Sequence, residues 1–266
     1  MNAEIVPSEP VEQDPLEEGR MTLWEHLEEL RKRLIISIVA IFAGFVVCWI
    51  YRDAILAFVQ APFIQYVSPG DKLAYISLTE PFIFYMKLAF FASLVFTSPI
   101  VFWQLWLFIA PGLYPKERRY ALPFIFFATF FFLSGCAFCY YFVFPFACRY
   151  FLEVGSQFKQ QVRVDDYFSL FSHLMLGIGL IFETPILAFF LGRFGILTHR
   201  WMLSKFKFAI LGSFIVSAII TPTPDMVNQT ILAIPMIALY GVSILIVWAF
   251  GKKRKAVEAE VEEPAS

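Results

Sequence analysis

Apolar residues along this chain are gathered in six long runs, and shorter polar segments separate the runs. A bilayer core about 30 Å thick needs roughly 20 consecutive apolar residues in helical form, and most of the runs approach or exceed that length. We therefore predict an all-α polytopic membrane protein with six transmembrane helices. The predicted spans cover residues 34–50, 80–109, 121–144, 165–191, 207–221 and 227–250, within one transmembrane domain at 21–251.

The last two spans are expected to be short and closely linked. Residues 207–221 supply only about fourteen residues of helix, near 21 Å at about 1.5 Å per residue, against roughly 30 Å of hydrocarbon. The sequence Thr-Pro-Thr-Pro-Asp at 221–225 turns the chain back at once, and Asp225 ends the turn. We hypothesise that this hairpin thins the bilayer locally, because hydrophobic mismatch can be relieved in that way.

Prolines mark the other expected turns. Pro62 breaks an apolar stretch at 55–67, which is predicted to form a short helix lying on the membrane. Pro111 lies in a tight turn at 110–119, because proline cannot continue a helix. Pro145 is expected to end the third span for the same reason.

Positive charge is concentrated in every second connection between the spans, which predicts the orientation. Fifteen of the 21 Lys and Arg residues fall on one side, five fall on the other, and Lys87 lies within a span. Segments rich in Lys and Arg remain in the cytoplasm because moving them against the membrane potential is unfavourable. Both termini are therefore expected in the cytoplasm, and Lys87 is expected to extend its ammonium group to the outer interface.

Composition agrees with a membrane protein and excludes a soluble domain. The chain is 59% hydrophobic, has 33 Phe residues and a mean hydropathy of +0.68, against roughly 45–50% apolar residues in soluble domains. Residues 1–20 hold six carboxylates and one Arg, which is unlike a cleavable signal peptide and indicates a disordered acidic tail. Residues 252–266 are expected to form a cytoplasmic tail, first basic and then acidic.

No catalytic, metal-binding or cofactor-binding motif is present, so we expect neither an enzyme nor a metalloprotein. The four cysteines lack metal-ligand spacing and are expected to pack as small apolar residues. Glu183 is the unusual residue, since an ionisable group near the middle of a span usually faces a cavity or a polar partner. It either donates to the carbonyl of Ile181, which Pro185 leaves free, or marks a polar concavity within the membrane.

Two further carboxylates, Glu29 and Glu117, lie in otherwise basic cytoplasmic segments. Each has a structural interpretation: Glu29 can pair with Arg33 one helical turn away, and Glu117 can complement the positive end of the third helix. The functional interpretation is that each accepts a charge-assisted, bidentate hydrogen-bond pair from an arginine of a ligand. On residue logic alone the structural interpretations are favoured.

Several segments resemble, in order, those of the TatC subunit of the twin-arginine protein translocase. The resemblance covers about residues 21–251, and the combination of motifs within a six-span chain is highly specific. The matching segments are 26–33 (HLEELRKR), 61–63 (APF), 108–114 (FIAPGLY) with 117–119 (ERR), 182–185 (FETP), 223–225 (TPD) and 232–235 (LAIP).

The resemblance implies a receptor that binds the paired arginines of a signal peptide on the cytoplasmic face. It also implies a core scaffold that helps to move folded proteins across the bacterial cytoplasmic (inner) membrane, driven by the proton-motive force. Glu29 and Glu117 then become the carboxylates that contact the arginines, and Arg31 lies in the same recognition segment.

Partners follow from the same resemblance. It implies the single-span subunits TatA and TatB, which pack near the last two spans with Gln229 as a polar contact, together with membrane lipid and further copies of this chain in a receptor complex. No nucleic acid is expected. The alternatives are a proton-coupled small-solute transporter using Glu183, for which the chain lacks the usual internal repeat, and a passive membrane scaffold.

Overall fold

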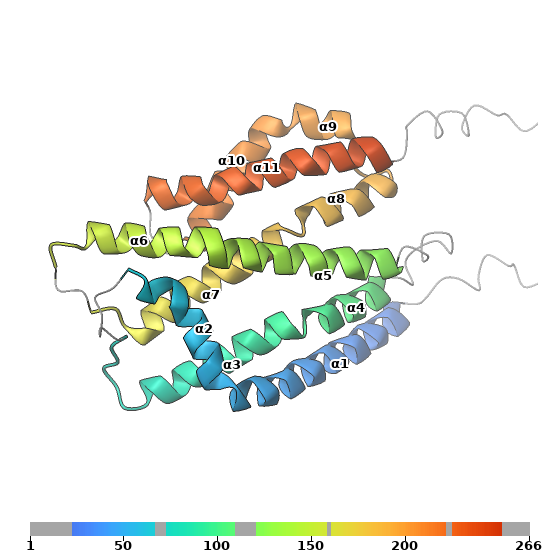
Figure 1. Cartoon of the computed structure of the whole chain (residues 1–266). Helices are drawn as coiled ribbons and strands as arrows, with labels where there is room; N and C mark the ends of the chain where they lie inside the picture. The colour runs from blue at the N-terminus through green and yellow to red at the C-terminus, as the bar shows by residue number, and fades with distance from the viewer. Residues whose placement is uncertain (1–22, 67–72, 110–120, 159–160, 222–224, 252–266) are drawn as a thin grey trace, which may run out of the picture.

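The computed structural model describes residues 23–66, 73–109, 121–158, 161–221 and 225–251, and within these ranges the chain is almost entirely helical (Figure 1). An isolated β-bridge between Ala74 and Arg163 is the single β-type pairing in these ranges. The helices are α1 (Leu23–Ile50), α2 (Arg52–Ile64), α3 (Glu80–Phe96), α4 (Ser98–Ile109), α5 (Ala121–Phe138), a π-helical turn (Cys139–Val143), α6 (Phe144–Val154), α7 (Val164–Ile181), α8 (Thr184–Arg193), α9 (His199–Ser204), α10 (Phe206–Ile220) and α11 (Met226–Phe250).

These helices form six spans, as predicted. Four stretches of the described chain are each long and apolar enough to cross a membrane: Trp24–Ile50, Pro123–Val154, Val164–Arg193 and Met226–Phe250. The pair α3 and α4 forms a fifth span, bent by 57°, and α10 is the short sixth apolar helix. With 15 residues α10 is as short as expected, whereas α11 has 25 residues, so the shortness predicted for both of the last two spans holds for α10 alone.

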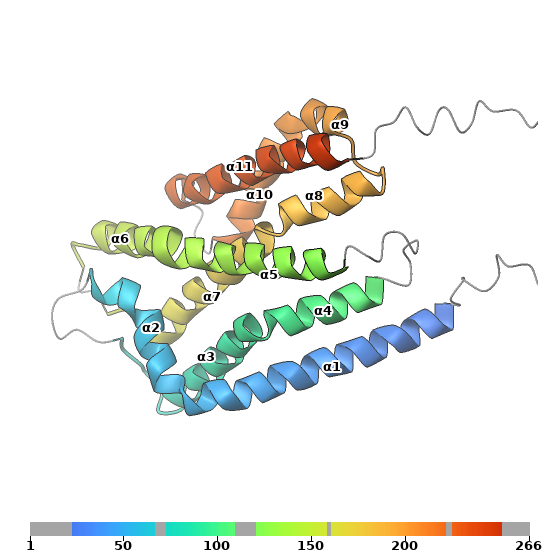
Figure 2. The ribbon, with the colours of Figure 1, turned by 45° about the vertical axis from the view of Figure 1, so that its right-hand side comes forward.

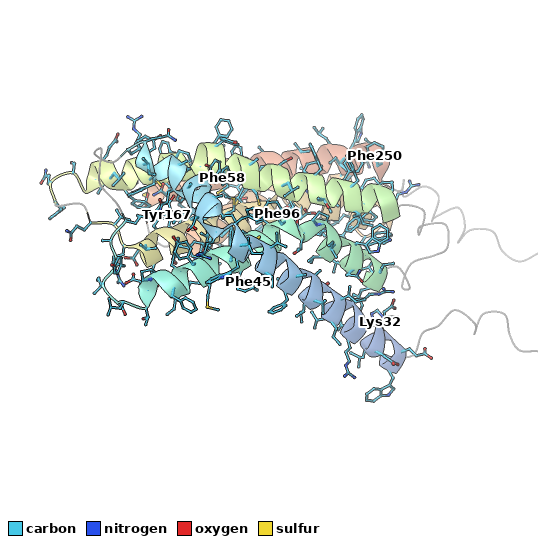
Figure 3. The ribbon with its side chains drawn as sticks, turned by 60° about the horizontal axis from the view of Figure 1, so that its bottom comes forward. Lys32, Phe45, Phe58, Phe96, Tyr167 and Phe250 are labelled. Carbon is cyan, nitrogen blue, oxygen red and sulfur yellow. The ribbon has the colours of Figure 1, made fainter. Side chains whose placement is uncertain are left out.

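Both ends of the described chain lie at the same end of the helix bundle, here called the terminal end. The start of α1, the end of α4, the start of α5, the link from α8 to α9 and the end of α11 all lie there (Figures 1 and 2). The helix α2 and the start of α7 lie at the opposite end, here called the α2 end. Lys32 and Phe250 mark the terminal end in Figure 3, whereas Tyr167 lies towards the α2 end.

The bend between α3 and α4 follows from a Ser-Pro dipeptide. Pro99 has no N–H and leaves the carbonyl of Val95 without its helical donor. The Ser98 hydroxyl donates to that carbonyl over 2.8 Å, so the polar group is satisfied within the span. Thr97 separates the two helices at this point and is buried. The span predicted as one continuous helix over 80–109 is therefore two helices.

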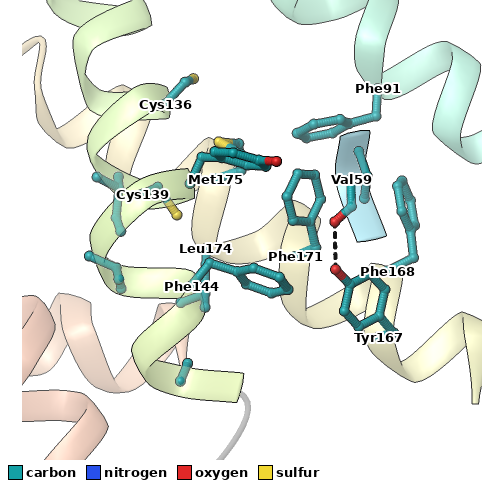
Figure 4. Packing of buried hydrophobic residues seen from close by; sticks show 14 of the residues in the cluster. Val59, Phe91, Cys136, Cys139, Phe144, Tyr167, Phe168, Phe171, Leu174 and Met175 are labelled. Carbon is teal, nitrogen blue, oxygen red and sulfur yellow. Dashed lines mark hydrogen bonds between the residues drawn. The ribbon is translucent and has the colours of Figure 1, made fainter. Parts of the chain in front are cut away.

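Pro62 does not break α2, contrary to the prediction, because the helix continues to Ile64. The proline removes the helical donor for the carbonyl of Phe58. The Tyr140 hydroxyl donates to that carbonyl over 2.7 Å, and the Tyr167 hydroxyl donates to the neighbouring carbonyl of Val59 over 2.6 Å (Figure 4). Two distant tyrosines thus bind the backbone of α2 around its proline.

Pro145 does not end the third span either, because helical structure continues through α6 to Val154. A π-helical turn at Cys139–Val143 precedes the proline, and the Phe144 N–H donates to the carbonyl of Cys139. In a π-helical turn each N–H donates to the carbonyl five residues earlier, so the hydrogen-bond pairing shifts just before the proline. The helix then continues as α6, with Pro145 in its first turn.

The main hydrophobic core lies between α2, α3, α5–α6 and α7 (Figure 4). Leu88, Phe144, Phe171 and Leu174 are almost fully buried in it, and the rings of Phe144 and Phe171 pack edge to face with centroids 5.1 Å apart. All four cysteines of the chain are buried and unbridged.

Two ion pairs join the N-terminal half of α3 to the start of α7 at the α2 end. Lys87 pairs with Asp165 over 2.7 Å, so its ammonium group has a carboxylate partner near the α2 end of the span. Arg163 pairs with Glu80 over 3.3 Å, and Glu80 also accepts from the backbone N–H of Ile76 over 2.9 Å. These contacts join α3 to α7 at the α2 end.

Candidate functional site

Glu29 lies in the second turn of α1 at the terminal end, and only one of its two carboxylate oxygens accepts a hydrogen bond from the described residues. Its Oε1 accepts from Arg33 Nη2 over 3.2 Å, which is the ion pair that the helical spacing predicts. Its side chain is 15% exposed, and Oε2 is buried without a hydrogen-bond partner among the described residues. The Nε atom of Arg33 is also buried and has no hydrogen-bond partner among the described residues. A carboxylate and a guanidinium here therefore each retain one unused hydrogen-bonding position.

The start of α1 is held against the end of α4 by an aromatic contact. The imidazole of His26 stacks on the ring of Phe108, with centroids 4.5 Å apart and planes inclined by 18°. Because His26 and Glu29 are three residues apart on one helix, this contact brings Glu29 to the side of α1 that faces α4. Arg31 is exposed on the same helix.

The second expected binding segment, which contains Glu117, lies outside the described residues. Glu117 and Pro111 lie outside the described residues, within 110–120. The helices that flank this segment, α4 and α5, end and begin at the terminal end, where α1 also begins (Figure 1). The structure therefore places Glu29 at the same end of the bundle as the end of α4 and the start of α5, which flank the segment that contains Glu117.

Glu183 lies at the break between α7 and α8. Pro185 leaves the carbonyl of Ile181 free, as predicted, but its donor is the Thr184 hydroxyl over 2.6 Å. The interpretation in which Glu183 caps that carbonyl is therefore wrong, because a neighbouring side chain already fills the role. The side chain of Glu183 is buried, and its Oε1 has no hydrogen-bond partner among the described residues.

The helices α5 and α7 pack closely together beside Glu183. A Cβ atom added to Gly135 would lie 2.8 Å from Cγ of Phe182, and one added to Gly179 would lie 2.9 Å from Cε2 of Phe132. The two glycines thus let the helices approach more closely than larger residues would allow. Glu183 follows directly after Phe182, so the unpartnered carboxyl oxygen lies next to a tight helix crossing.

The hairpin of α10 and α11 is closed by polar groups. Gln229 Nε2 donates to the carbonyl of Phe214 over 2.8 Å, and the Ser217 hydroxyl donates to the carbonyl of Gln229 over 2.7 Å. Asp225 is the N-cap of α11, where its carboxylate accepts from the N–H of Asn228 over 2.8 Å. The amide of Gln229, expected from the sequence as a partner contact, thus also holds this hairpin together.

The chain is similar to known proteins over most of its length. The family model described as "Sec-independent protein translocase protein (TatC)" matches residues 25–235. The chain belongs to the TatC family. The proteins of this family are components of the Sec-independent protein translocase, which assigns the chain to protein transport rather than to catalysis or to small-solute exchange.

Relatives in the TatC family match over most of their length. The TatC protein of Koribacter versatilis is 44% identical over 246 residues, covering 91% of each chain. A TatC protein of Helicobacter pylori is 45% identical over 222 residues, covering 83% of this chain and 85% of the relative. The crystal structure of the twin arginine translocase receptor TatC is 32% identical, with a TM-score of 0.73 over 84% of this chain and 98% of that one. The resemblance and the six-span fold predicted from the sequence are thereby confirmed.

Sequence reasoning gave no role to His26 or Thr184, although both lie in the TatC-like segments. A hydroxyl residue directly before a proline is a local signal that could have identified Thr184 as the donor to Ile181, and Ser98 before Pro99 repeats it. The stack of His26 on Phe108 joins residues far apart in the sequence, so no local sequence pattern predicts it.

Proposed function

We propose that this TatC-family protein is the receptor for twin-arginine signal peptides, with Glu29 and Glu117 as the carboxylates that bind the two guanidinium groups. The proposal depends on the carboxylate of Glu29. Its Oε1 accepts a hydrogen bond from Arg33, whereas its Oε2 is buried without a partner among the described residues. Solved TatC structures at 32% identity are titled as twin arginine translocase receptors, which supports the assignment. Arg31 is exposed in the same segment and is a further proposed contact of the peptide.

The proposed chemistry is charge-assisted hydrogen bonding at the membrane surface. Arg33 engages Oε1 of Glu29, so an incoming guanidinium group donates to Oε2 and shares the carboxylate. Arginine fits this role better than lysine, because its planar group donates in a fixed fork whereas an ammonium group acts as a point charge. Recognition of two adjacent arginines then requires a second carboxylate, for which Glu117 is the candidate.

We place the terminal end in the cytoplasm, so that both termini and the binding segment face the compartment in which signal peptides are made. The excess of Lys and Arg in the connections at this end supports that orientation. The membrane is then the bacterial cytoplasmic membrane, and translocation of the folded cargo is driven by the proton-motive force.

TatA and TatB are the proposed partners, beside further copies of this chain. The half-buried Gln229 is the proposed polar contact for one of these single-span subunits at the α10–α11 hairpin. Glu183, buried with one oxygen unpartnered among the described residues, is the proposed polar position within the membrane. The first assignment rests on the partial exposure of Gln229, and the second on the burial of an ionisable group within a span.

A binding experiment on Glu29 tests the receptor proposal. We expect Glu29→Gln in the full-length protein, reconstituted in nanodiscs, to weaken binding of a labelled twin-arginine signal peptide by about tenfold or more, as loss of a charge-assisted pair predicts. Glu28→Gln is the matched control, because Glu28 is the adjacent carboxylate of α1 and is exposed. Equal affinity of wild type and Glu29→Gln, or equal affinity for paired-Arg and paired-Lys peptides, would defeat the proposal.

A further inference from the structure

The short helix α9 and the first turn of α10 form a basic, apolar shelf at the terminal end, here called the α9 shelf (residues 199–208). Arg200, Lys205 and Lys207 are exposed on it. Exposed apolar side chains alternate with these cations, and Trp201 is 52% exposed, Leu203 55% and Phe208 56%. Cationic and large apolar side chains are thus mixed within ten residues of chain.

No carboxylate neutralises these cations within the described chain. The sequence has no Asp or Glu between Thr184 and Pro224. None of the ion pairs among the described residues involves Arg200, Lys205 or Lys207. The positive charge of the shelf therefore remains available to an external anion.

Two of the cations are gathered around one aromatic ring. The Nζ atoms of Lys205 and Lys207 lie 5.4 Å and 5.3 Å from the ring centroid of Phe208. Cation–π attraction favours each ammonium position, but the two like charges repel one another. A shared anion placed between the ammonium groups would relieve this repulsion.

The α9 shelf is fixed to the bundle rather than loosely attached. The side chain of Met202 is buried against Ala188, Ile244 and Val247, and the Tyr240 hydroxyl donates to the carbonyl of Met202 over 3.0 Å. With one residue of α9 held in this way, its neighbours Trp201 and Leu203 point outwards and remain exposed. The exposed cations consequently have a stable support.

Location decides which anion the shelf meets. The shelf leads directly into α10, whose apolar residues enter the bilayer, and it lies at the end that carries the start of α1 and the end of α11 (Figures 1 and 2). Exposed Trp and Phe are typical of the membrane–water interface, and so are Lys and Arg that reach the headgroups. A nucleic acid or an acidic soluble protein would not account for the exposed Trp201, Leu203 and Phe208.

We propose that the α9 shelf is a binding site for anionic phospholipid, in which Arg200, Lys205 and Lys207 hold the phosphate-bearing headgroups and Trp201, Leu203 and Phe208 lie among the upper acyl carbons. Basic residues near a membrane surface attract anionic lipids individually, and a fixed cluster concentrates that attraction. The site fastens one end of the shortest span to the headgroup layer of its leaflet.

The test measures lipid retention by the full-length protein. Wild type and variants are purified in mild detergent from membranes containing phosphatidylglycerol and phosphatidylcholine, and the retained lipids are quantified by mass spectrometry. We expect wild type to be enriched in phosphatidylglycerol, and Arg200→Gln, Lys205→Gln and Lys207→Gln each to lower the enrichment, by up to about fivefold per cation. The triple variant Lys205→Arg, Lys207→Arg, Arg200→Lys preserves the charge and should retain the enrichment.

A matched control separates this site from general positive charge. Lys252→Gln, Lys253→Gln and Arg254→Gln remove the same charge from the C-terminal tail and should leave the enrichment unchanged. The comparison uses a shelf variant that combines Arg200→Gln, Lys205→Gln and Lys207→Gln. Equal loss of enrichment in this variant and in the tail variant, or full enrichment in this variant, would overturn the proposal.

A second measurement needs no variant of the shelf. In wild-type nanodiscs, acylation of Lys205 and Lys207 should be severalfold slower with phosphatidylglycerol than with phosphatidylcholine, relative to Lys252 and Lys253. Equal protection in both lipids would overturn the proposal. So would protection in phosphatidylcholine that disappears when residues 256–266 are deleted, because the acidic tail would then be the occupant.

Discussion

The Tyr140 hydroxyl donates to the carbonyl oxygen of Phe58 over 2.7 Å, and this is the carbonyl that Pro62 deprives of its helical donor. The two residues are 82 positions apart, so the third span completes the backbone hydrogen bonding of a helix formed much earlier in the chain. The proline of α2 and the tyrosine of the third span are in this sense one structural unit.

Tyr140→Phe is expected to destabilise the protein by about 1–2 kcal/mol, because it leaves a partly buried carbonyl without a donor. The measurement is the midpoint of chemical denaturation in detergent. Pro62→Ala restores the helical N–H to Phe58, so Tyr140→Phe should be clearly less harmful in that background. Equal effects in both backgrounds would show that the hydroxyl does not compensate for the proline. Tyr141→Phe, at an exposed position, is the control.

His26→Ala is expected to weaken signal-peptide binding roughly two- to tenfold, since aromatic contacts of this kind contribute about 0.5–1.5 kcal/mol. The reason is positional: the stack on Phe108 holds α1 against α4, and Glu29 lies on the following turn. Fluorescence anisotropy of a labelled peptide measures the effect. His26→Phe keeps a stacking ring and should bind nearly as wild type does, so an equal defect in both variants would argue against the stacking role.

Gly135→Ala is expected to destabilise the bundle by about 1–3 kcal/mol, as other overpacked sites do. Its Cβ atom would lie 2.8 Å from Phe182 and 3.0 Å from the Cα atom of Gly179, and backbone cannot move aside easily. The matched control is Gly212→Ala in α10, where the added atom meets nothing within 4 Å. That control should be neutral or slightly stabilising, because alanine favours helix over glycine by about 1 kcal/mol.

Thr184→Val is expected to lower stability by about 1 kcal/mol, since the carbonyl of Ile181 then lacks its donor within the membrane. Thr184→Ser retains the hydroxyl and should restore most of the loss, as judged by the thermal midpoint of the detergent-solubilised protein. Unchanged stability of Thr184→Val, which keeps the methyl group and replaces only the hydroxyl, would show that this hydrogen bond does not stabilise the protein.

The length of α10 was predictable from the sequence because the length of an apolar run limits the length of a span, and its 15 residues were anticipated almost to the residue. Consequences of proline were predicted less well. Pro62 and Pro145 were expected to end helices, yet α2 and the third span continue past them. A π-helical turn and a distant tyrosine accommodate these prolines, and neither has a local signature.

In the candidate site, too, local contacts were predictable from the sequence and long-range contacts were not. The pairing of Glu29 with Arg33 follows from helical spacing and was foreseen. Donation to the carbonyl of Ile181 was one of two interpretations considered for Glu183, and Thr184 was not considered as the donor, because a protonated carboxyl and a hydroxyl are both possible donors and only geometry chooses between them. Contacts across the bundle, such as His26 on Phe108, depend on the three-dimensional arrangement alone.

Burial of all four thiols, at Cys48, Cys136, Cys139 and Cys148, has a practical consequence for anyone who studies this protein in its membrane. A water-borne maleimide reagent reaches exposed thiols and reacts slowly with those enclosed by side chains. Cysteines introduced one at a time along residues 110–120 can therefore be scanned for reagent access in the native background, without first replacing the protein's own cysteines.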